Sequence, residues 1–173
     1  EQEVSAYAAS CLDMIKDVLS EERLEVRPNS EWLGTMDMHQ LLELTSTTTV
    51  ARLLERDDFA KRFAAQQPIS LIEFMYPILQ AMDSVAVKAD IELGGADQLW
   101  NLLMGRQVQS RFDQEPQVAV TVPLLVGTDG TRKMSQSYDN YISIREAPEE
   151  MFGKVMSLPD EAMEQWFLLA AGY

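Results

Sequence analysis

The residues that decide the fold are Ile91-Glu92-Leu93-Gly94-Gly95-Ala96-Asp97-Gln98, where a short apolar run meets two glycines and a polar helix start. We expect a strand ending at Leu93, a tight turn through the glycines, and a helix over about residues 97–111. Pro116 then precedes a second apolar run, residues 118–122, which is typical of a strand. A strand, a helix and a strand in succession predict a parallel α/β sheet.

Helical periodicity dominates the chain before this unit. Alternation over residues 24–27 predicts one short strand there, and the threonine-rich run 45–49 predicts a break between helices. A capping box at Ser70–Glu73 predicts a helix to about Met82, bent at Pro77. The other expected helices cover residues 4–19, 36–44, 50–55 and about 57–63, the last with Asp57 or Asp58 as its cap.

Three side chains on the helix that begins at Ser70 are candidates for ligand binding. Tyr76, Gln80 and Asp83 stand at i, i+4 and i+7, so they share one narrow stripe. Such a stripe is most often a solvated face of an amphipathic helix. The alternative is a polar cluster facing a small ligand, because a phenol, an amide and a carboxylate suit an ammonium group and a hydroxyl.

The glycine turn is a second candidate site. Gly94 and Gly95 allow close approach of a ligand to the backbone, the following helix offers unpaired N–H groups to an anion, and Asp97 can bind ribose hydroxyls. A tight turn with Asp97 as an N-cap explains the same residues equally well.

A third candidate is the polar, glycine-rich stretch 127–137, which should form a mobile loop. Arg132 and Lys133 stand there among hydroxyl residues, which favours a phosphate site, although a plain surface connector is as good an explanation. After it the chain is expected to be helical, with Pro148 and Pro159 at helix starts.

Composition sets limits on function. The 173 residues carry a net charge of −14, with 46% hydrophobic and 24% charged residues, as in an ordinary globular domain. One cysteine excludes a disulfide framework, and with one histidine, His39, it makes a metal site unexpected. The sequence contains no run of about 18 consecutive apolar residues, which is the length that would predict a membrane span. The acidic balance argues against a large nucleic-acid surface on this stretch, and the helical start without Met indicates a piece of a longer chain.

Taken together, the three candidates resemble bacterial tyrosyl-tRNA synthetases, which are class I aminoacyl-tRNA synthetases. The residues Lys133-Met134-Ser135-Gln136-Ser137 are similar to the KMSKS loop, Tyr76 to Asp83 match the YxxxQxxD segment, and Gly94 to Gln98 match the GG-x-DQ turn. Further similar stretches are residues 29–33, 50–59 and 140–142.

The resemblance implies an α/β fold with a Rossmann-like parallel sheet, the second half of the class I nucleotide-binding fold, and a helical insertion. The expected parts are a helical insertion or connective region with a short strand at 1–69, the second half of the nucleotide-binding fold at 70–125, a mobile KMSKS-like loop at 126–137, and a helical segment at 138–173.

The resemblance also implies roles for single residues. Tyr76 and Gln80 would hold the amino group of tyrosine, Asp83 its phenolic hydroxyl, and Gln98 would lie near the carboxylate and α-phosphate. The implied catalytic residues are Lys133, Arg132 and Gln136. The implied ATP-binding residues are Gly94, Gly95, Asp97, Leu125, Val126, Lys133, Met134, Ser135, Gln136 and Ser137.

The implied activity is that of a cytoplasmic tyrosine–tRNA ligase, which forms tyrosyl-adenylate from L-tyrosine and ATP with Mg²⁺, and then esterifies tRNA(Tyr). No tightly bound metal and no membrane are implied. A homodimer is implied through roughly residues 31–65, where Val50, Leu53, Leu54, Phe59 and Phe63 supply either the interface or the core.

Three departures from the family pattern matter. The HIGH motif is absent, so it should precede Glu1, and an anticodon-binding region should follow Tyr173; residues 1–173 alone should be inactive. Gln136 replaces the second lysine of KMSKS, and we expect Arg132 to compensate for the lost charge. Glu92 stands where many relatives have Gln, either as a structural acid or as a group that helps position the amino group.

Three other functions remain open on the sequence. The nearest is a tryptophanyl-tRNA synthetase, which the residues Tyr76, Gln80 and Asp83 disfavour. Gln136 and the missing HIGH motif would also suit a non-catalytic, synthetase-derived module for RNA binding or dimerisation. Another nucleotidyltransferase with a similar loop is disfavoured by the segment that contains Tyr76.

Overall fold

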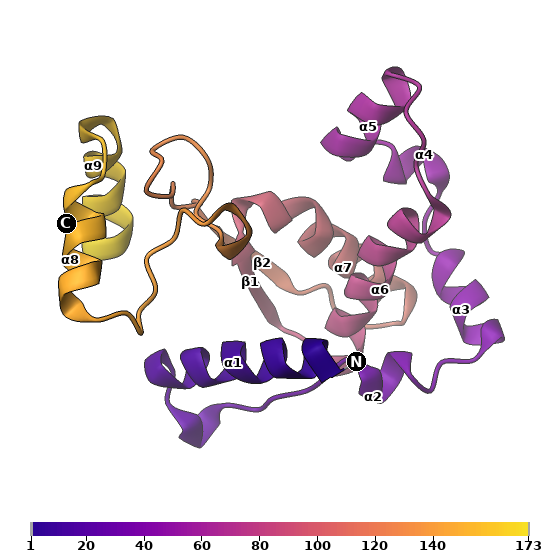
Figure 1. The fold of residues 1–173 in the computed structure, drawn as a ribbon. Coiled ribbons are helices and arrows are strands. Elements are labelled where there is room, and N and C mark those ends of the chain that lie inside the picture. The colour runs from indigo at the N-terminus through magenta and orange to yellow at the C-terminus, as the bar shows by residue number, and fades with distance from the viewer. Residues whose placement is uncertain (1, 173) are drawn as a thin grey trace. The chain divides into compact units, whose positions relative to one another are not determined.

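The computed structural model describes residues 2–172 and divides the chain into two compact units (Figure 1). One unit comprises residues 27–124, and the other combines the N-terminal stretch up to Val26 with the stretch from Leu125 onward. Each unit is described by itself.

The unit of residues 27–124 contains the parallel strands and most of the helices. Its elements are α2 (Ser30–Leu33), α3 (Met38–Thr45), α4 (Val50–Leu53), α5 (Asp57–Ala64), α6 (Leu71–Val87), β1 (Ile91–Gly95), a 3₁₀ turn (Ala96–Gln98), α7 (Leu99–Arg111) and β2 (Val118–Val122).

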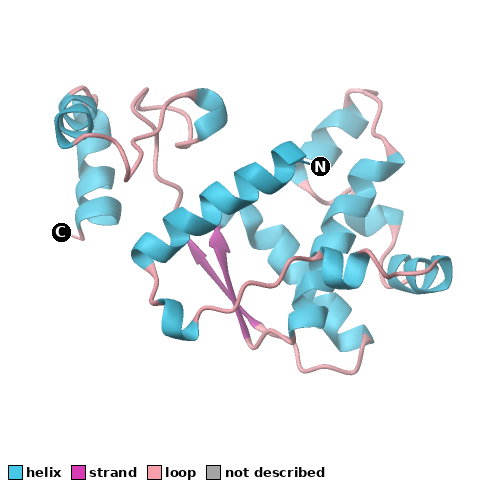
Figure 2. Ribbon diagram, turned by 60° about the horizontal axis from the view of Figure 1, so that its bottom comes forward, coloured by secondary structure: helices cyan, strands magenta, loops and turns pink. Residues whose placement is uncertain are grey.

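The two strands β1 and β2 are parallel, as the sequence predicts (Figure 2). Ile91 lies opposite Val118, and Gly95 lies opposite Val122. Helix α7 connects them and packs against both strands and against α6. This strand–helix–strand unit confirms the expected α/β class. The predicted end of the strand at Leu93 was wrong, because Gly94 and Gly95 continue β1 and pair with β2. The glycine turn, residues 94–98, therefore begins within β1 and turns only at Ala96–Gln98.

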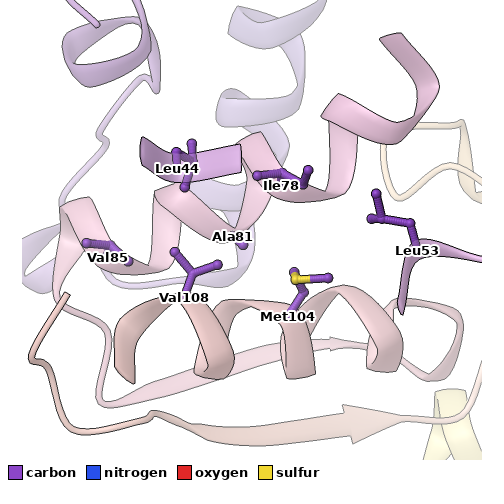
Figure 3. Close-up of a cluster of buried hydrophobic side chains, with 7 residues drawn as sticks. All are labelled: Leu44, Leu53, Ile78, Ala81, Val85, Met104 and Val108. Carbon is purple, nitrogen blue, oxygen red and sulfur yellow. The ribbon is translucent and has the colours of Figure 1, made fainter. Parts of the chain in front are cut away.

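The core of this unit lies between α6 and α7 (Figure 3). Apolar side chains of the two helices point toward one another, and α3 and α4 each add one buried leucine. The cluster consists of Leu44, Leu53, Ile78, Ala81, Val85, Met104 and Val108. Burial of these side chains fixes the orientation of α6 and hence of its polar stripe.

The helix starts follow the capping rules. The backbone N–H of Ser70 donates to Glu73 Oε1 at 2.9 Å, which confirms the capping box. Arg62 on α5 donates to the same carboxylate at 3.0 Å. This hydrogen bond is the main cause that lowers the pKa of Glu73 to about 2, and it ties α5 to α6.

Several predicted boundaries were wrong. Residues 24–27 form no strand: Leu24 is extended, but no other strand of the described chain pairs with this stretch, and a strand needs such a partner. Asp57 does not cap α5, because it lies in the first helical turn after Arg56. Helix α6 runs five residues past Met82, to Val87, and ends where Lys88 turns left-handed with φ 54°.

The second unit is mainly helical. Its elements are α1 (Gln2–Val18), a 3₁₀ turn (Glu21–Arg23), a second 3₁₀ turn (Gln136–Tyr138), α8 (Pro148–Met156), α9 (Asp160–Trp166) and a π-helical turn (Phe167–Ala171). Pro148 starts α8 and Pro159 caps α9, as predicted. Arg145, which precedes α8, is bonded to the last turn of α1, because its Nε donates to Asp17 Oδ2 at 2.7 Å. Within residues 2–172, no helix has both the length and the apolar character that a membrane crossing requires.

Candidate functional site

The polar stripe of α6 is held from a distant part of the chain. Trp32 Nε1 donates to Asp83 Oδ1 at 2.8 Å. Tyr76 is 61% exposed, whereas the Oε1 atom of Gln80 is buried and accepts no hydrogen bond from the described residues. The stripe therefore includes a fixed carboxylate and a buried polar atom, which a purely solvated helix face would not contain.

Burial raises the pKa of the Asp83 carboxyl above its ordinary value. Hydrogen bonds from Trp32 and Asn29 oppose part of this rise, and the negative charge of Glu92 adds to it. Sequence analysis assigned no role to Trp32 or Asn29 individually. Their only signal was that residues 29–33 resemble the corresponding stretch of the tyrosyl-tRNA synthetases.

Glu92 serves the structure of this unit. Its Oε2 accepts from Ser84 Oγ at 2.6 Å and also from Gln117 Nε2. Gln117 is almost fully buried, and its backbone N–H donates to Gln109 Oε1 at 2.8 Å. These bonds tie β1 to α6 one residue after Asp83, which supports the interpretation of Glu92 as a structural acid.

The glycine turn is closely packed. A Cβ atom on Gly95 would lie 2.7 Å from Leu124 Cδ2 and 2.8 Å from Asp97 Oδ1, so a side chain there requires both neighbours to move. Gln98 Oε1 accepts from Asn101 Nδ2 at 2.9 Å. Asp97 does not cap α7 as one interpretation predicted, because a 3₁₀ turn intervenes and Gln98 takes the cap position.

The KMSKS-like stretch is a hydrogen-bonded hairpin. Val126 and Lys133 form an antiparallel bridge, and the backbone N–H of Met134 donates to Leu125 O at 2.8 Å. Gly130 has φ +68°, the left-handed conformation that favours glycine in a turn. The hairpin thus has a defined fold, while its mobility stays a prediction.

Arg132 is engaged within the hairpin. Its Nε donates to Asp129 Oδ2 at 2.9 Å, and its guanidinium lies 4.9 Å from the centre of the Tyr138 ring. Backbone N–H groups of Thr131 and Arg132 also donate to Asp129 and, as the main causes, hold the pKa of that carboxyl well below its usual range. A phosphate would have to compete with Asp129 for this guanidinium.

Three of the remaining loop residues, Met134, Ser135 and Gln136, line a pocket. Lys133, Met134, Gln136 and Ser137 are exposed, and Ser135 Oγ lies 2.8 Å from Ser137 Oγ. A pocket of about 300 Å³ adjoins them. Its lining consists of Met14, Met134, Ser135, Gln136, Tyr141, Ile142, Ser143 and Ile144.

The predicted site residues fall into two sets. Tyr76, Gln80, Asp83 and residues 94–98 belong to the unit of residues 27–124, whereas Leu125, Val126 and residues 132–137 belong to the other unit. The hydrogen bond between Ser84 and Glu92 brings α6 and β1 together in the first set. Across the described part of the chain, no three His, Cys, Asp or Glu side chains are grouped as metal ligands.

Comparison with known proteins identifies the family. The model of tRNA synthetases class I (W and Y) matches residues 1–173. Tyrosine–tRNA ligase of Aquifex aeolicus is 57% identical over 90% of this chain and 40% of its own length, and that of Moorella thermoacetica is 53% identical over 98% and 41%. The chain therefore spans about 40% of the length of these relatives.

The same kind of fold occurs in a solved structure. Tyrosyl-tRNA synthetase of Archaeoglobus fulgidus, crystallised with L-tyrosine, aligns with 91% of this chain and 49% of its own. The TM-score is 0.74 and the sequence identity 28%.

Proposed function

The chain belongs to the class I tRNA synthetases of the tryptophan and tyrosine type, and from this membership we propose that it forms part of the active site of a tyrosine–tRNA ligase. The observation that carries the proposal is the stripe of Tyr76, Gln80 and Asp83 on α6, in which Trp32 holds the Asp83 carboxylate. The neighbouring Ser84 ties the same helix to Glu92 on β1. The substrates are L-tyrosine, ATP with Mg²⁺, and tRNA(Tyr).

The proposed reaction has two steps. The carboxylate of tyrosine attacks the α-phosphorus of ATP in line and expels pyrophosphate. The tyrosyl-adenylate then transfers its acyl group to the terminal ribose hydroxyl of the tRNA and releases AMP. Such chemistry requires positioning of the substrates and stabilisation of phosphate charge, rather than a protein nucleophile.

Tyrosine recognition is assigned to α6. Asp83 accepts the phenolic hydrogen bond, because its carboxyl is held in a half-buried position by the indole of Trp32. The amide of Gln80, whose buried Oε1 lacks a partner among the described residues, and the phenol of Tyr76 receive the ammonium group. Gln98 lies toward the carboxylate. A site that pairs with the substrate hydroxyl rejects phenylalanine, for which this enzyme type is a known example.

ATP binding is assigned to two segments. Gly94, Gly95 and Asp97 hold the ribose, since the absence of side chains at the turn permits close approach. Leu125 and Val126 line the adenine. Lys133 and Arg132 neutralise the departing phosphates, and Met134, Ser135, Gln136 and Ser137 complete the phosphate loop.

Tyrosine is favoured over tryptophan as the substrate. The family model covers both specificities, but the relatives at 57% and 53% identity are both tyrosine–tRNA ligases. A protein of this activity works where tRNA and ATP are present, so we assign it to the cytoplasm. We also assign it a homodimeric state, through the region of about residues 31–65.

The test is amino-acid-dependent exchange of pyrophosphate into ATP by the protein at the full length of its relatives. Tyrosine should support exchange, and tryptophan and phenylalanine should not. Residues 1–173 alone, which lack the HIGH motif, should show no exchange. Exchange with tryptophan would assign the other specificity, and full-length protein without any exchange would favour the non-catalytic module that Gln136 suits.

A further inference from the structure

Asn140 lies outside the KMSKS-like stretch but holds it in shape. Only 3% of this residue is exposed. Its Nδ2 donates to Asp129 Oδ2 at 3.0 Å and to Lys133 O at 3.2 Å, and its Oδ1 accepts from the backbone N–H of Ser135 at 2.8 Å. One buried amide therefore bonds both to the turn of the hairpin and to its returning strand.

The backbone of Asn140 makes a further contact with the same hairpin. The N–H of Thr128 donates to Asn140 O at 2.8 Å. Gly127 leaves the space that this approach requires, since a Cβ atom there would lie 2.2 Å from Asn140 Cγ and 2.5 Å from Asn140 O. The hairpin is thus built around this residue.

The amide of Asn140 suits this position better than a carboxylate of the same shape would. The amide offers donors and an acceptor on one planar group, and here both kinds of atom are used. An aspartate of the same shape would lose both donated bonds and would bring a second carboxylate to within about 3 Å of Asp129. A buried polar group that loses its partner destabilises the structure that depended on the bond.

We propose that Asn140 is a positioning residue for ATP, which fixes the backbone that carries Lys133 and Ser135 by bonding to Asp129, Lys133 and Ser135. This inference rests on the proposed function, because it assigns the loop to the phosphates. Tyrosine recognition is assigned to residues of the other unit, 27–124. Loss of the amide should therefore affect the use of ATP and leave the affinity for tyrosine unchanged.

The experiment uses the full-length protein with Asn140→Asp, and with Asp139→Asn as a matched control on the exposed neighbouring residue. The double variant Asp139→Asn/Asn140→Asp keeps the net charge of the wild type. Two quantities are measured: the rate of tryptic cleavage after Arg132 and Lys133, and the KM values for ATP and tyrosine in pyrophosphate exchange.

Asn140→Asp and the double variant should be cleaved in the loop at least about tenfold faster than wild type, with a KM for ATP raised by a similar factor. The KM for tyrosine should stay within about twofold, a difference of about 0.4 kcal/mol. Asp139→Asn should match the wild type. Asn140→Ser, which is smaller and adds no charge, should also raise the rate of loop cleavage and the KM for ATP. This variant replaces Asn140→Asp in the test if the aspartate variant fails to fold.

Unchanged loop cleavage in both Asn140 variants would overturn the proposal. An equal rise of both KM values would also overturn it, because that indicates a general loss of structure. If the wild type shows no tyrosine-dependent exchange, the proposed function fails and the assignment to ATP fails with it. The tryptic comparison still decides, in that case, whether Asn140 holds the loop.

Discussion

Single residues determine how the candidate site distinguishes its ligand, and Asp83 is the most informative. In the proposed function its carboxyl accepts a hydrogen bond from the substrate, yet burial raises its pKa, so ionisation is less favourable in the folded state than in the unfolded chain. Because the pKa of Asp83 is higher in the folded state, protonation of this carboxyl stabilises the fold. The stabilisation is complete at pH values below the pKa of the unfolded chain, and it is lost as the pH rises through the pKa of the folded state. At neutral pH the ionised Asp83 therefore lowers the stability of the fold, although the proposed function requires it as an acceptor.

Asp83→Asn should relieve this conflict. The variant should unfold at a temperature equal to or above that of wild type at neutral pH, and the advantage should decrease as the pH falls through the pKa of Asp83. The KM for tyrosine should rise at least about tenfold, because a hydrogen bond to a charged group is worth about 1.5–3 kcal/mol. Thermal unfolding at several pH values and exchange kinetics check both effects; an unchanged KM would remove Asp83 from the tyrosine site.

Arg132 and Gln136 together determine how much positive charge the KMSKS-like stretch carries beside Lys133. If Arg132 supplies the charge that the second signature lysine otherwise provides, Arg132→Ala should lower kcat/KM for ATP at least about tenfold. Gln136→Lys should change it less than about threefold, that is about 0.6 kcal/mol. Both are measured in pyrophosphate exchange by the full-length protein.

The hydrogen bond between Arg132 and Asp129 makes a further control variant necessary. Because Arg132 also binds Asp129, its removal loosens the loop as well as removing a charge. Arg132→Lys keeps the charge and should retain most of the activity if charge is what matters. Arg111→Ala removes one exposed positive charge in the other unit and should have no effect. A large gain from Gln136→Lys would count against compensation.

Among secondary-structure elements, the junction of α6 and β1 links the two predicted binding segments of one unit. Glu92 on β1 accepts hydrogen bonds from Ser84 on α6 and from Gln117, which directly precedes β2. This junction holds the glycine turn against the helix that carries Asp83. It also explains why Gly105 on α7 has no side chain, since a Cβ there would lie 2.7 Å from Ser84 Oγ.

Glu92→Gln should weaken this junction. Ser84 and Gln117 both donate to the same carboxylate oxygen. The neutral oxygen of a glutamine is a weaker acceptor for both bonds, because the charge assistance is lost. We expect a loss of about 1–3 kcal/mol in the free energy of unfolding, measured with urea. Glu115→Gln, an exposed acid of the same unit, is the matched control and should be neutral. An unaltered midpoint in Glu92→Gln would show that the network adds nothing to stability.

In the whole molecule, the exposed fraction of each apolar side chain distinguishes core residues from candidates for the proposed dimer surface. The sequence left open whether several apolar residues of the region 31–65 belong to the core or to the dimer interface. Of these, Leu53 and Phe59 are buried, whereas Val50 is 60% and Phe63 is 64% exposed. Leu71 and Ile72, at the start of α6, are 80% and 70% exposed. Val50 and Phe63 are therefore available for the proposed dimer interface, whereas Leu53 and Phe59 belong to the core.

Phe63→Asp should therefore shift the full-length protein from dimer to monomer, because it places a charge within an apolar interface. Sedimentation velocity measures the change. Phe152→Asp makes the same exchange at a position that is 67% exposed on α8 and should leave the mass unaltered. A Phe63→Asp protein that remains dimeric would assign the interface to another surface.

The sequence by itself determined the features that depend on neighbouring residues. Helix starts at Ser70, Pro148 and Pro159 and the family motifs all depend on residues within a few positions, so local patterns predict them. Local apolar runs also predicted both strands, but not that Gly94 and Gly95 continue β1, because those glycines pair with distant residues of β2. The predicted strand at residues 24–27 failed for the converse reason. Alternation favours an extended backbone but does not supply the neighbouring strand that pairs with it.

Only the tertiary structure decided which side chains meet. Trp32 bonds to Asp83 across 51 positions, and Glu92 bonds to Gln117 across 25. Asn140 closes the hairpin from outside the motif. Such contacts depend on how α6, α7 and the strands pack around a shared core, because burial and hydrogen bonding between distant residues are settled together when the chain folds.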